Sequence, residues 1–238
     1  MFTHHRTDGI VLARKEKGEA DEVLTLFTKD FGKVEVVGRS IRKGGSKLRM
    51  SMSLFSHVEI SFIEGKAYNT LTDARTIQDP KDAKEDLKKL SFLYRISELT
   101  LLLLKGPQEE ERILSLLLST IEEVDKKDLS REELKLLFCL FSFRILYFLG
   151  YKLYTEKCVF CGSAIEKECI FDPKEGGVAC KKCSRSAFSG IRLHKVTLLR
   201  DLFSANSAPS EKDVDTLLHA LENYLSFIPE AKGKRFIH

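Results

Sequence analysis

Short apolar runs alternate with turn-forming residues through the first third of the chain. The runs are rich in Val, Ile, Leu, Phe and Thr, and they cover residues 10–13, 23–28, 33–38, 54–62 and 69–77. In the fourth run Val58, Ile60 and Phe62 alternate with polar neighbours, which is the period of a half-buried strand. Five strands within fewer than 80 residues predict a small closed or partly closed barrel, because closure removes exposed strand edges.

The apolar period changes to that of helices from residue 79 onward. Asp79 followed by Pro80 predicts a helix start, and Ser130 with Glu133 predicts a capping box for a later helix. That later helix is apolar nearly all round, so we expect it to form the buried centre of a helical domain. The predicted helices cover residues 80–104, 109–124, 130–150, 193–203 and 211–228.

This order of elements predicts an α+β multidomain protein. A segment with four paired cysteines interrupts the helices, and we expect the last helices to pack back on the first set. The predicted parts are an N-terminal barrel over residues 1–79, a first helical part over 80–153, a zinc module over 154–186 and a second helical part over 187–238.

Composition and charge exclude several classes of protein. The chain is 43% hydrophobic, and its 39 Lys+Arg against 35 Asp+Glu give a net charge of only +4, so polyanion binding requires a local patch. The longest apolar run spans residues 101–104, far short of the ~20 residues that cross a bilayer. The N-terminus lacks the pattern of a signal peptide. We therefore expect a soluble, cytoplasmic protein that does not enter a membrane.

Four of the six cysteines form two C-x-x-C pairs that 18 residues separate. One tight turn per pair aims two thiolates at a single ion, and two turns complete a tetrahedron. The pattern predicts a structural zinc site in which no ligand position is left for a catalytic water. The predicted ligands are Cys158, Cys161, Cys180 and Cys183.

Other assignments of the cysteines stay open at this stage. The two pairs could form a redox site or disulfides instead, although an intracellular dithiol needs only one C-x-x-C. Cys139 and Cys169 are best interpreted as buried thiols, with Cys169 as an alternative fifth ligand because it lies between the pairs.

A basic segment follows the second predicted strand. Between residues 33 and 55 the only acid is Glu35, and glycines and serines separate the cations, which indicates a mobile or phosphate-tracking connection. Small barrels bind single strands by combining a positive groove with aromatic platforms. We expect Phe31, in a turn, to be the better stacking candidate, and Phe27, Phe55 and Phe62 to pack in the core. The residues predicted to contact nucleic-acid phosphates are Lys33, Arg39, Arg42, Lys43, Lys47 and Arg49, for which an ordinary solvated basic loop is the alternative.

Signatures of catalysis are absent from the sequence. It contains no phosphate loop, no H-E-x-x-H, no G-x-S-x-G and no dinucleotide fingerprint, and its histidines do not fall at ligand spacing with carboxylates. We therefore expect a protein that is not an enzyme. Metal-dependent hydrolysis would need an open coordination site and a general base.

Several sequence segments, taken in their order along the chain, resemble one bacterial family. They read TDGIVL at residues 7–12, GEAD at 18–21, LFT at 26–28 followed by GK at 32–33, FSFRIL at 141–146 and LGY at 149–151. These motifs, and the order of barrel, helices and cysteine pairs, resemble the recombination mediator family RecO over nearly the whole chain. Ser142 departs from this family's pattern, in which a Glu is expected at that place.

The resemblance implies an OB-fold barrel, a helical domain and a zinc module in a nucleoid-associated protein. It implies binding of single- and double-stranded DNA, annealing of complementary strands without ATP, and loading of RecA, together with RecR, onto DNA coated by single-stranded-DNA-binding protein (SSB). The C-terminal tail of SSB would dock on the helical domain, with Arg144 and Lys152 as candidate anchors. A zinc-braced scaffold whose main partners are proteins is the alternative function.

Overall fold

The computed structural model describes residues 3–104, 110–151, 153–165, 169–183, 191–193 and 210–229. The chain divides into two compact units, Met1–Asp128 and Leu129–His238, and each is described by itself. The finer division into barrel, two helical parts and zinc module stays a prediction.

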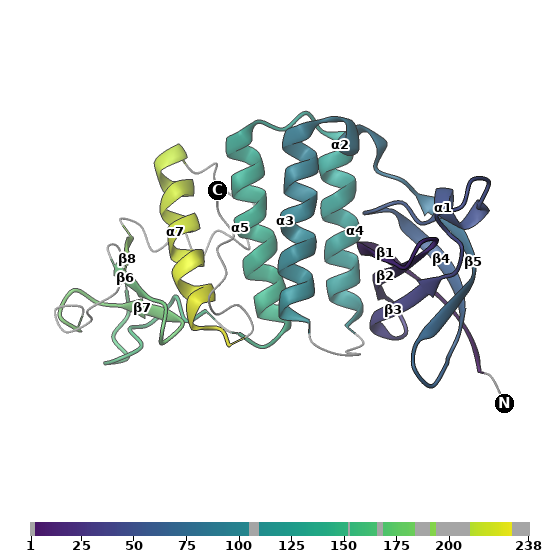
Figure 1. Cartoon of the computed structure of the whole chain (residues 1–238). Coiled ribbons are helices and arrows are strands. Elements are labelled where there is room, and N and C mark those ends of the chain that lie inside the picture. Colours follow the sequence, from purple (N-terminus) through teal and green to yellow (C-terminus); the bar gives the residue numbers. More distant parts are fainter. Residues whose placement is uncertain are drawn as a thin grey trace. The chain divides into compact units, whose positions relative to one another are not determined.

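The first unit begins with a closed barrel of five strands (Figure 1). The strands follow each other around the barrel in the order β1-β2-β3-β5-β4, and every pairing is antiparallel except that of β3 with β5. This arrangement is an OB-type barrel and confirms the predicted fold class. The strands are β1 (His4–Lys17), β2 (Asp21–Thr28), β3 (Gly32–Gly38), β4 (His57–Ile63) and β5 (Asn69–Gln78).

The alternation in the sequence places the apolar side chains inside this barrel. In β4 the buried positions are Val58, Ile60 and Phe62, as the pattern predicts. Phe27 and Phe55 are also buried, which confirms their expected place in the core. The core cluster comprises Val11, Leu24, Leu26, Val34, Val36, Ile41, Met52, Val58, Ile60, Phe62 and Leu71.

The Thr-Asp-Gly motif of β1 has a structural reason. The Thr7 hydroxyl donates a 2.6 Å hydrogen bond to Asp30, and the Asp8 carboxylate lies 3.0 Å from the His57 ring nitrogen. A Cβ atom on Gly9 would lie 2.4 Å from the carbonyl oxygen of Phe27, which is closer than real contacts allow. The motif therefore fixes the start of β1 against its neighbours in the barrel.

The basic connection between β3 and β4 is anchored to the barrel at both ends. Ile41 and Met52 are fully buried in the core cluster, and the partly buried Leu48 packs against it. Between these anchors the chain forms the short helix α1 (Lys47–Ser51), which the sequence did not predict. The cations of this segment are thus carried on a backbone that the core holds in place.

Helices α2 (Lys81–Glu85), α3 (Leu87–Leu103) and α4 (Glu111–Lys126) complete the first unit. The prediction that the Asp79 side chain caps a helix is wrong. The Asp86 side chain caps α3 by accepting from the backbone amides of Lys88 and Lys89, while Asp79 accepts from the hydroxyl of Ser56 and from Lys84. A single predicted helix is therefore interrupted at Asp86.

The second unit combines two long helices with a small sheet. Its elements are α5 (Arg131–Phe148), β6 (Cys169–Asp172), β7 (Gly177–Ala179), β8 (Ile191–Leu193) and α7 (Glu211–Phe227). The Ser130–Glu133 capping box is confirmed at the start of α5. Helix α7 contacts α5, where Lys135 and Asp215 lie 3.2 Å apart.

The small sheet was not predicted from the sequence. Its strand order is β7-β6-β8, and the ring of Phe171 in β6 packs edge-on against Tyr224 of α7, with centroids 5.9 Å apart. The helix predicted over residues 193–203 lies outside the described residues except for Leu193, which ends β8. Among the helices described, none is both long enough and apolar enough to cross a membrane.

Candidate functional site

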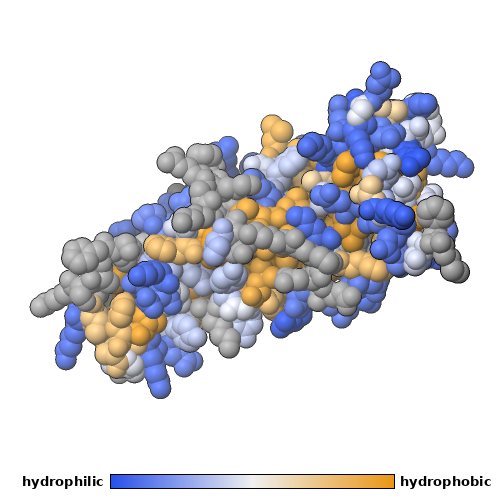
Figure 2. All heavy atoms as spheres, turned by 60° about the horizontal axis from the view of Figure 1, so that its bottom comes forward, coloured by the Kyte–Doolittle hydropathy of each residue, from blue (hydrophilic) through white to orange (hydrophobic). Residues whose placement is uncertain are grey.

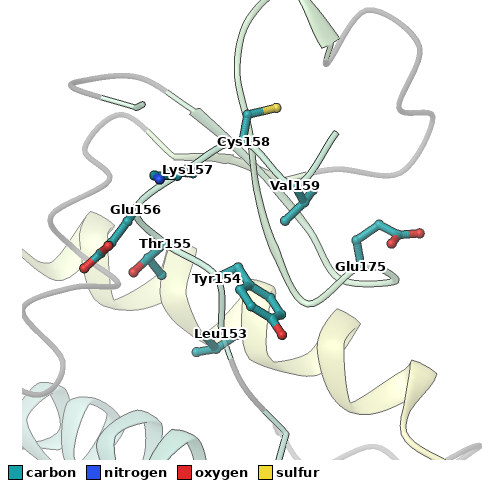
Figure 3. Close-up of a pocket in the computed structure, with 8 residues that line it drawn as sticks. All are labelled: Leu153, Tyr154, Thr155, Glu156, Lys157, Cys158, Val159 and Glu175. Carbon is teal, nitrogen blue, oxygen red and sulfur yellow. The ribbon is translucent and has the colours of Figure 1, made fainter. Parts of the chain in front are cut away.

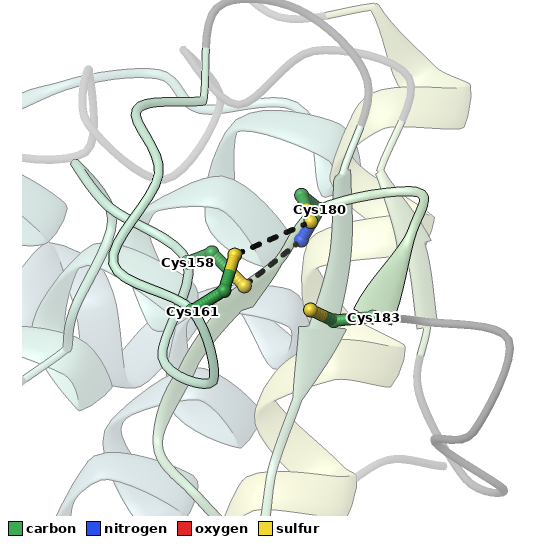
Figure 4. Close-up of side chains that lie close together, drawn as sticks. All are labelled: Cys158, Cys161, Cys180 and Cys183. Carbon is green, nitrogen blue, oxygen red and sulfur yellow. Dashed lines mark hydrogen bonds between the residues drawn. The ribbon is translucent and has the colours of Figure 1, made fainter.

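The two C-x-x-C pairs come together in the second unit. Figure 4 shows their four sulfurs turned toward one another, and all four lie within 4.8 Å of each other. The sulfurs of Cys161 and Cys180 are 3.8 Å apart. A tetrahedral ion with metal–sulfur bonds of about 2.3 Å sets its ligands about 3.8 Å apart, so this spacing fits such an ion.

Backbone hydrogen bonds bring the first pair to the second. The amide of Tyr154 donates to the carbonyl of Gly176, and the amide of Val178 donates back to Tyr154, at 3.0 and 2.9 Å. The amide of Val159 also donates to Val178 at 3.0 Å. Residues 153–159 therefore run beside the β6–β7 hairpin, which leads directly into Cys180, and with Glu175 they line a hollow of about 570 Å³ (Figure 3).

The turn of the first pair also depends on local geometry. The amide of Gly162 donates to the carbonyl of Cys158 at 2.8 Å, and Gly162 has a φ of 72°, which a residue with a side chain adopts only with strain. The amide of Cys180 points at the sulfur of Cys158 across 3.4 Å. This contact joins the first pair directly to the second.

The electrostatics of the cluster favour the thiolate at two of its cysteines and the thiol at a third. Hydrogen bonds from the backbone amide of Cys183 lower the pKa of Cys180 to about 6, although loss of hydration opposes this shift. The hydroxyl and amide of Ser163 lower the pKa of Cys161. The thiol of Cys183 interacts with the sulfurs of Cys161 and Cys180, which raises its pKa to about 12. A cation at the centre would hold all four as thiolates, the form that binds metal.

The remaining cysteines are not members of this cluster. Cys139 is buried in α5 and Cys169 is buried in β6, and among the described residues the potential metal ligands that gather are the four paired cysteines. The four fit a closed metal site, with no fifth ligand from Cys169.

The predicted DNA-binding cations fall into two groups in the structure. The exposed group lies on the connection between β3 and β4, and we call it the connection cations: Arg39, Lys43, Lys47 and Arg49. Within the part of the chain that the structure describes, the ammonium groups of Lys43 and Lys47 have no hydrogen bond or ion pair, and no carboxylate pairs with Arg39 or Arg49. In Figure 2 hydrophilic residues cover much of the barrel, at the right of the view.

The other two predicted residues are engaged within the first unit. The ammonium of Lys33 donates to the carbonyls of Leu101 and Leu104 at 3.2 Å each, where α3 ends. Arg42 forms an ion pair with Glu16 at 2.9 Å and donates to the carbonyl of Gly18. Lys33 therefore secures a helix end, and Arg42 secures the connection to the β1–β2 hairpin.

Tyr68 is a surface residue that the sequence analysis missed. It lies on the loop between β4 and β5, is 42% exposed, and accepts a 3.3 Å hydrogen bond from the guanidinium of Arg39. The ammonium of Lys17 sits 3.9 Å from the centre of its ring. Its place shortly after the turn formers Glu64, Gly65 and Lys66 was the local signal in the sequence. The expected stacking residue Phe31 is half-buried: it packs against the core and also lines a pocket that Tyr68 shares.

The fold and the cysteine cluster together define a class: an OB-type barrel protein with a helical part and a four-cysteine cluster whose geometry fits a metal ion. The family described as Recombination protein O N terminal matches residues 1–80, and that described as Recombination protein O C terminal matches residues 84–231. Together these matches cover most of the chain. The chain belongs to the RecO family.

Relatives named DNA repair protein RecO are also similar to this chain over most of its length. The relative from Dehalococcoides mccartyi is 31% identical over 187 residues, which cover 78% of this chain and 72% of that protein. The relative from Symbiobacterium thermophilum is 30% identical over 79% of this chain and 75% of its own. The relative from Alkaliphilus metalliredigens is 26% identical over 81% of this chain and 77% of its own.

Proposed function

We propose that this protein binds single- and double-stranded DNA in recombinational repair and anneals complementary strands without ATP. The observation that carries the proposal is the set of connection cations, which are exposed on an anchored backbone and have no carboxylate partner among the described residues. Membership of the RecO family and the names of the relatives support the same function.

The mechanism of annealing is neutralisation of charge. Two DNA strands repel each other, and a protein that brings cations to both phosphate backbones lowers this barrier without a chemical step. Arg and Lys contacts to phosphate are independent of sequence, so the same surface serves single strands and duplex. No catalytic group is needed, and we propose that the protein is not an enzyme.

We propose zinc as the ion of the four-cysteine site, with a structural role. A closed set of four thiolates is the usual arrangement of structural zinc. The ion would supply folding free energy to a segment whose strands contain only three or four residues. Cys158, Cys161, Cys180 and Cys183 would hold it.

Two protein partners complete the proposal. With RecR, the protein would help load RecA onto DNA coated by SSB, and the acidic SSB tail would dock on the helices. Arg144 is exposed on α5, where it could meet an acidic peptide. The second candidate anchor, Lys152, lies outside the described residues. We place this activity at the nucleoid.

The direct test is strand annealing in the absence of nucleotide. A variant with Arg39, Lys43, Lys47 and Arg49 all changed to Ala removes the connection cations. It should anneal complementary strands about tenfold or more slowly, because electrostatic attraction of the strands is lost. A matched control removes four lysines on or beside α2–α4: Lys81, Lys88, Lys126 and Lys127. Equal annealing by both variants would contradict the proposal.

The alternative function, a metal-braced protein scaffold, predicts the opposite pattern. Its partner binding would survive loss of the connection cations and would fail in Cys180→Ser. We favour the DNA-binding function because the connection cations are set on an OB-type barrel, the kind of module that binds oligonucleotides. Measuring DNA binding and RecR binding on both variants distinguishes the two functions.

A further inference from the structure

A pocket of about 510 Å³ opens on the barrel beside the loop that joins β4 and β5. This volume lies in the range of about 300–1,000 Å³ that is typical of pockets for small ligands. Residues from β1, β3, β4 and β5 line it, together with the β2–β3 and β4–β5 loops, so several separate segments of the barrel shape one site.

One wall of the pocket is aromatic. The ring centres of His5 and Phe31 are 4.9 Å apart, those of His5 and Phe62 are 5.1 Å apart, and those of Phe31 and Phe62 are 5.5 Å apart. Phe62 is buried in the barrel core and holds the group in place, whereas Phe31 is only half-buried and lines the pocket. The wall thus presents a π-surface that the core keeps rigid.

The polar groups of the lining suit a base better than a phosphate. Glu35 and Glu64 bring two carboxylates, of which that of Glu64 lies 3.2 Å from a ring nitrogen of His5. The ammonium of Lys33 is already bonded to helix carbonyls, which leaves Lys66 as the free lysine among the described lining residues. Carboxylates repel phosphate but accept hydrogen bonds from the amino groups of bases. The lining therefore favours a flat, uncharged ring with hydrogen-bonding edges.

Tyr68 joins this pocket to the cationic surface. It lines the pocket, while Arg39 donates to its hydroxyl at 3.3 Å and the ammonium of Lys17 lies 3.9 Å from its ring centre. A strand whose phosphates contact Arg39 and Lys17 would therefore carry its bases past the mouth of the pocket. The cationic surface and the pocket together match one nucleotide, whose phosphate would lie outside the pocket and whose base would lie inside it.

We infer that the pocket takes an unpaired base of single-stranded DNA, stacked on Phe31 and Tyr68. The inference rests on the proposed function and deepens it, because it gives the surface a preference for single strands. Bases in duplex DNA are paired and stacked on each other, so they do not enter. Stacking on an aromatic side chain is tolerant of sequence, since every base has a π-face.

The test compares three ligands: a single strand, the same strand built from abasic residues, and a duplex. Phe31→Leu keeps the bulk of the side chain and removes its π-face, and Tyr68→Leu does the same on an exposed loop. Each variant should bind the single strand about fivefold or more weakly, the equivalent of ~1 kcal/mol of stacking. Affinity for the abasic strand and the duplex should not change, and Phe31→Leu should keep the salt dependence of the wild type.

Tyr94→Leu serves as the matched control, because Tyr94 is 52% exposed on α3 and does not line the pocket. Duplex affinity reports whether each variant is folded. The inference is overturned if the wild type binds abasic and normal strands equally, if neither pocket variant weakens single-strand binding, or if both weaken duplex binding to the same extent. Failure of the proposed function looks different, because the wild type would then bind neither strand nor duplex in a salt-dependent way.

Discussion

The four-cysteine site makes a prediction that connects geometry to a metal measurement. The purified chain should contain one zinc ion per molecule, because four sulfurs within 4.8 Å of each other complete one tetrahedron. Cobalt added in place of zinc should give the absorption of a tetrahedral four-thiolate complex. Structural zinc sites of this kind contribute about 10–16 kcal/mol in small peptides, so chelation should lower the melting temperature of the protein.

The pKa values of the cluster set the pH dependence of metal binding. Cys180, with a pKa of about 6, is already a thiolate at neutral pH, whereas Cys183, with a pKa of about 12, keeps its proton until the metal displaces it. At least one proton is therefore released on binding, and the affinity for zinc should rise by about tenfold or more per pH unit near neutrality.

Single substitutions test whether these four residues are the ligands. Cys180→Ser should lose the stoichiometric zinc, and Cys169→Ser should retain it, because Cys169 is buried in β6 outside the cluster. Metal content is measured by mass spectrometry on the full chain. A wild-type protein without zinc, or equal loss of zinc in both variants, would refute the reasoning.

Three further predictions concern the first unit and are checked by urea unfolding. Lys33→Met should lower the free energy of unfolding by about 1–3 kcal/mol, because two helix carbonyls lose their donor, and should leave duplex affinity unchanged; a large loss of duplex affinity would show that Lys33 contacts the DNA backbone. Ile41→Ala should cost about 2–5 kcal/mol, since its side chain is fully buried, and a neutral effect would contradict its role as an anchor. Burial alone would raise the pKa of Asp79, but hydrogen bonds from Lys84 and Ser56 outweigh it and lower that pKa. The ionised Asp79 therefore stabilises the fold fully above the unfolded pKa of about 3.9, and this contribution is lost as the pH falls through the folded pKa. Asp79→Asn should therefore be about 1–2 kcal/mol less stable at neutral pH and equal to wild type in strong acid, whereas a difference that persists in acid would contradict this explanation.

Local periodicity was sufficient to predict the barrel but not the limits of its strands. The alternation in β4 gave both the strand and its buried face. β1 extends to Lys17 although its last four residues are polar, because Lys17 pairs with Asp21 across the hairpin. Backbone pairing and polar contacts such as the ion pair of Arg14 with Glu22 sustain that extension, so no apolar signal marks it. The short strands β6–β8 were missed because each contains only three or four residues, too few to show a period.

The candidate sites show where the sequence pattern carries information and where it does not. The spacing of Cys158 and Cys161 is a local signal, and the structure brings that pair to the second one. Lys33 looked like its neighbours in a basic segment, but its partners are 68 and 71 residues away in the sequence. The pocket beside Tyr68 combines side chains from several strands, so no single motif could have indicated it.

The most direct test of the account is the salt dependence of single-strand binding. Each phosphate contact on a single strand contributes a slope of about −0.7 to the plot of log affinity against log salt. Loss of the four connection cations should make the slope shallower by about 3, so the wild type should lose about 50-fold more affinity than the quadruple variant between about 50 and 200 mM salt. Equal slopes for the two proteins would contradict the claim that these cations bind the DNA backbone.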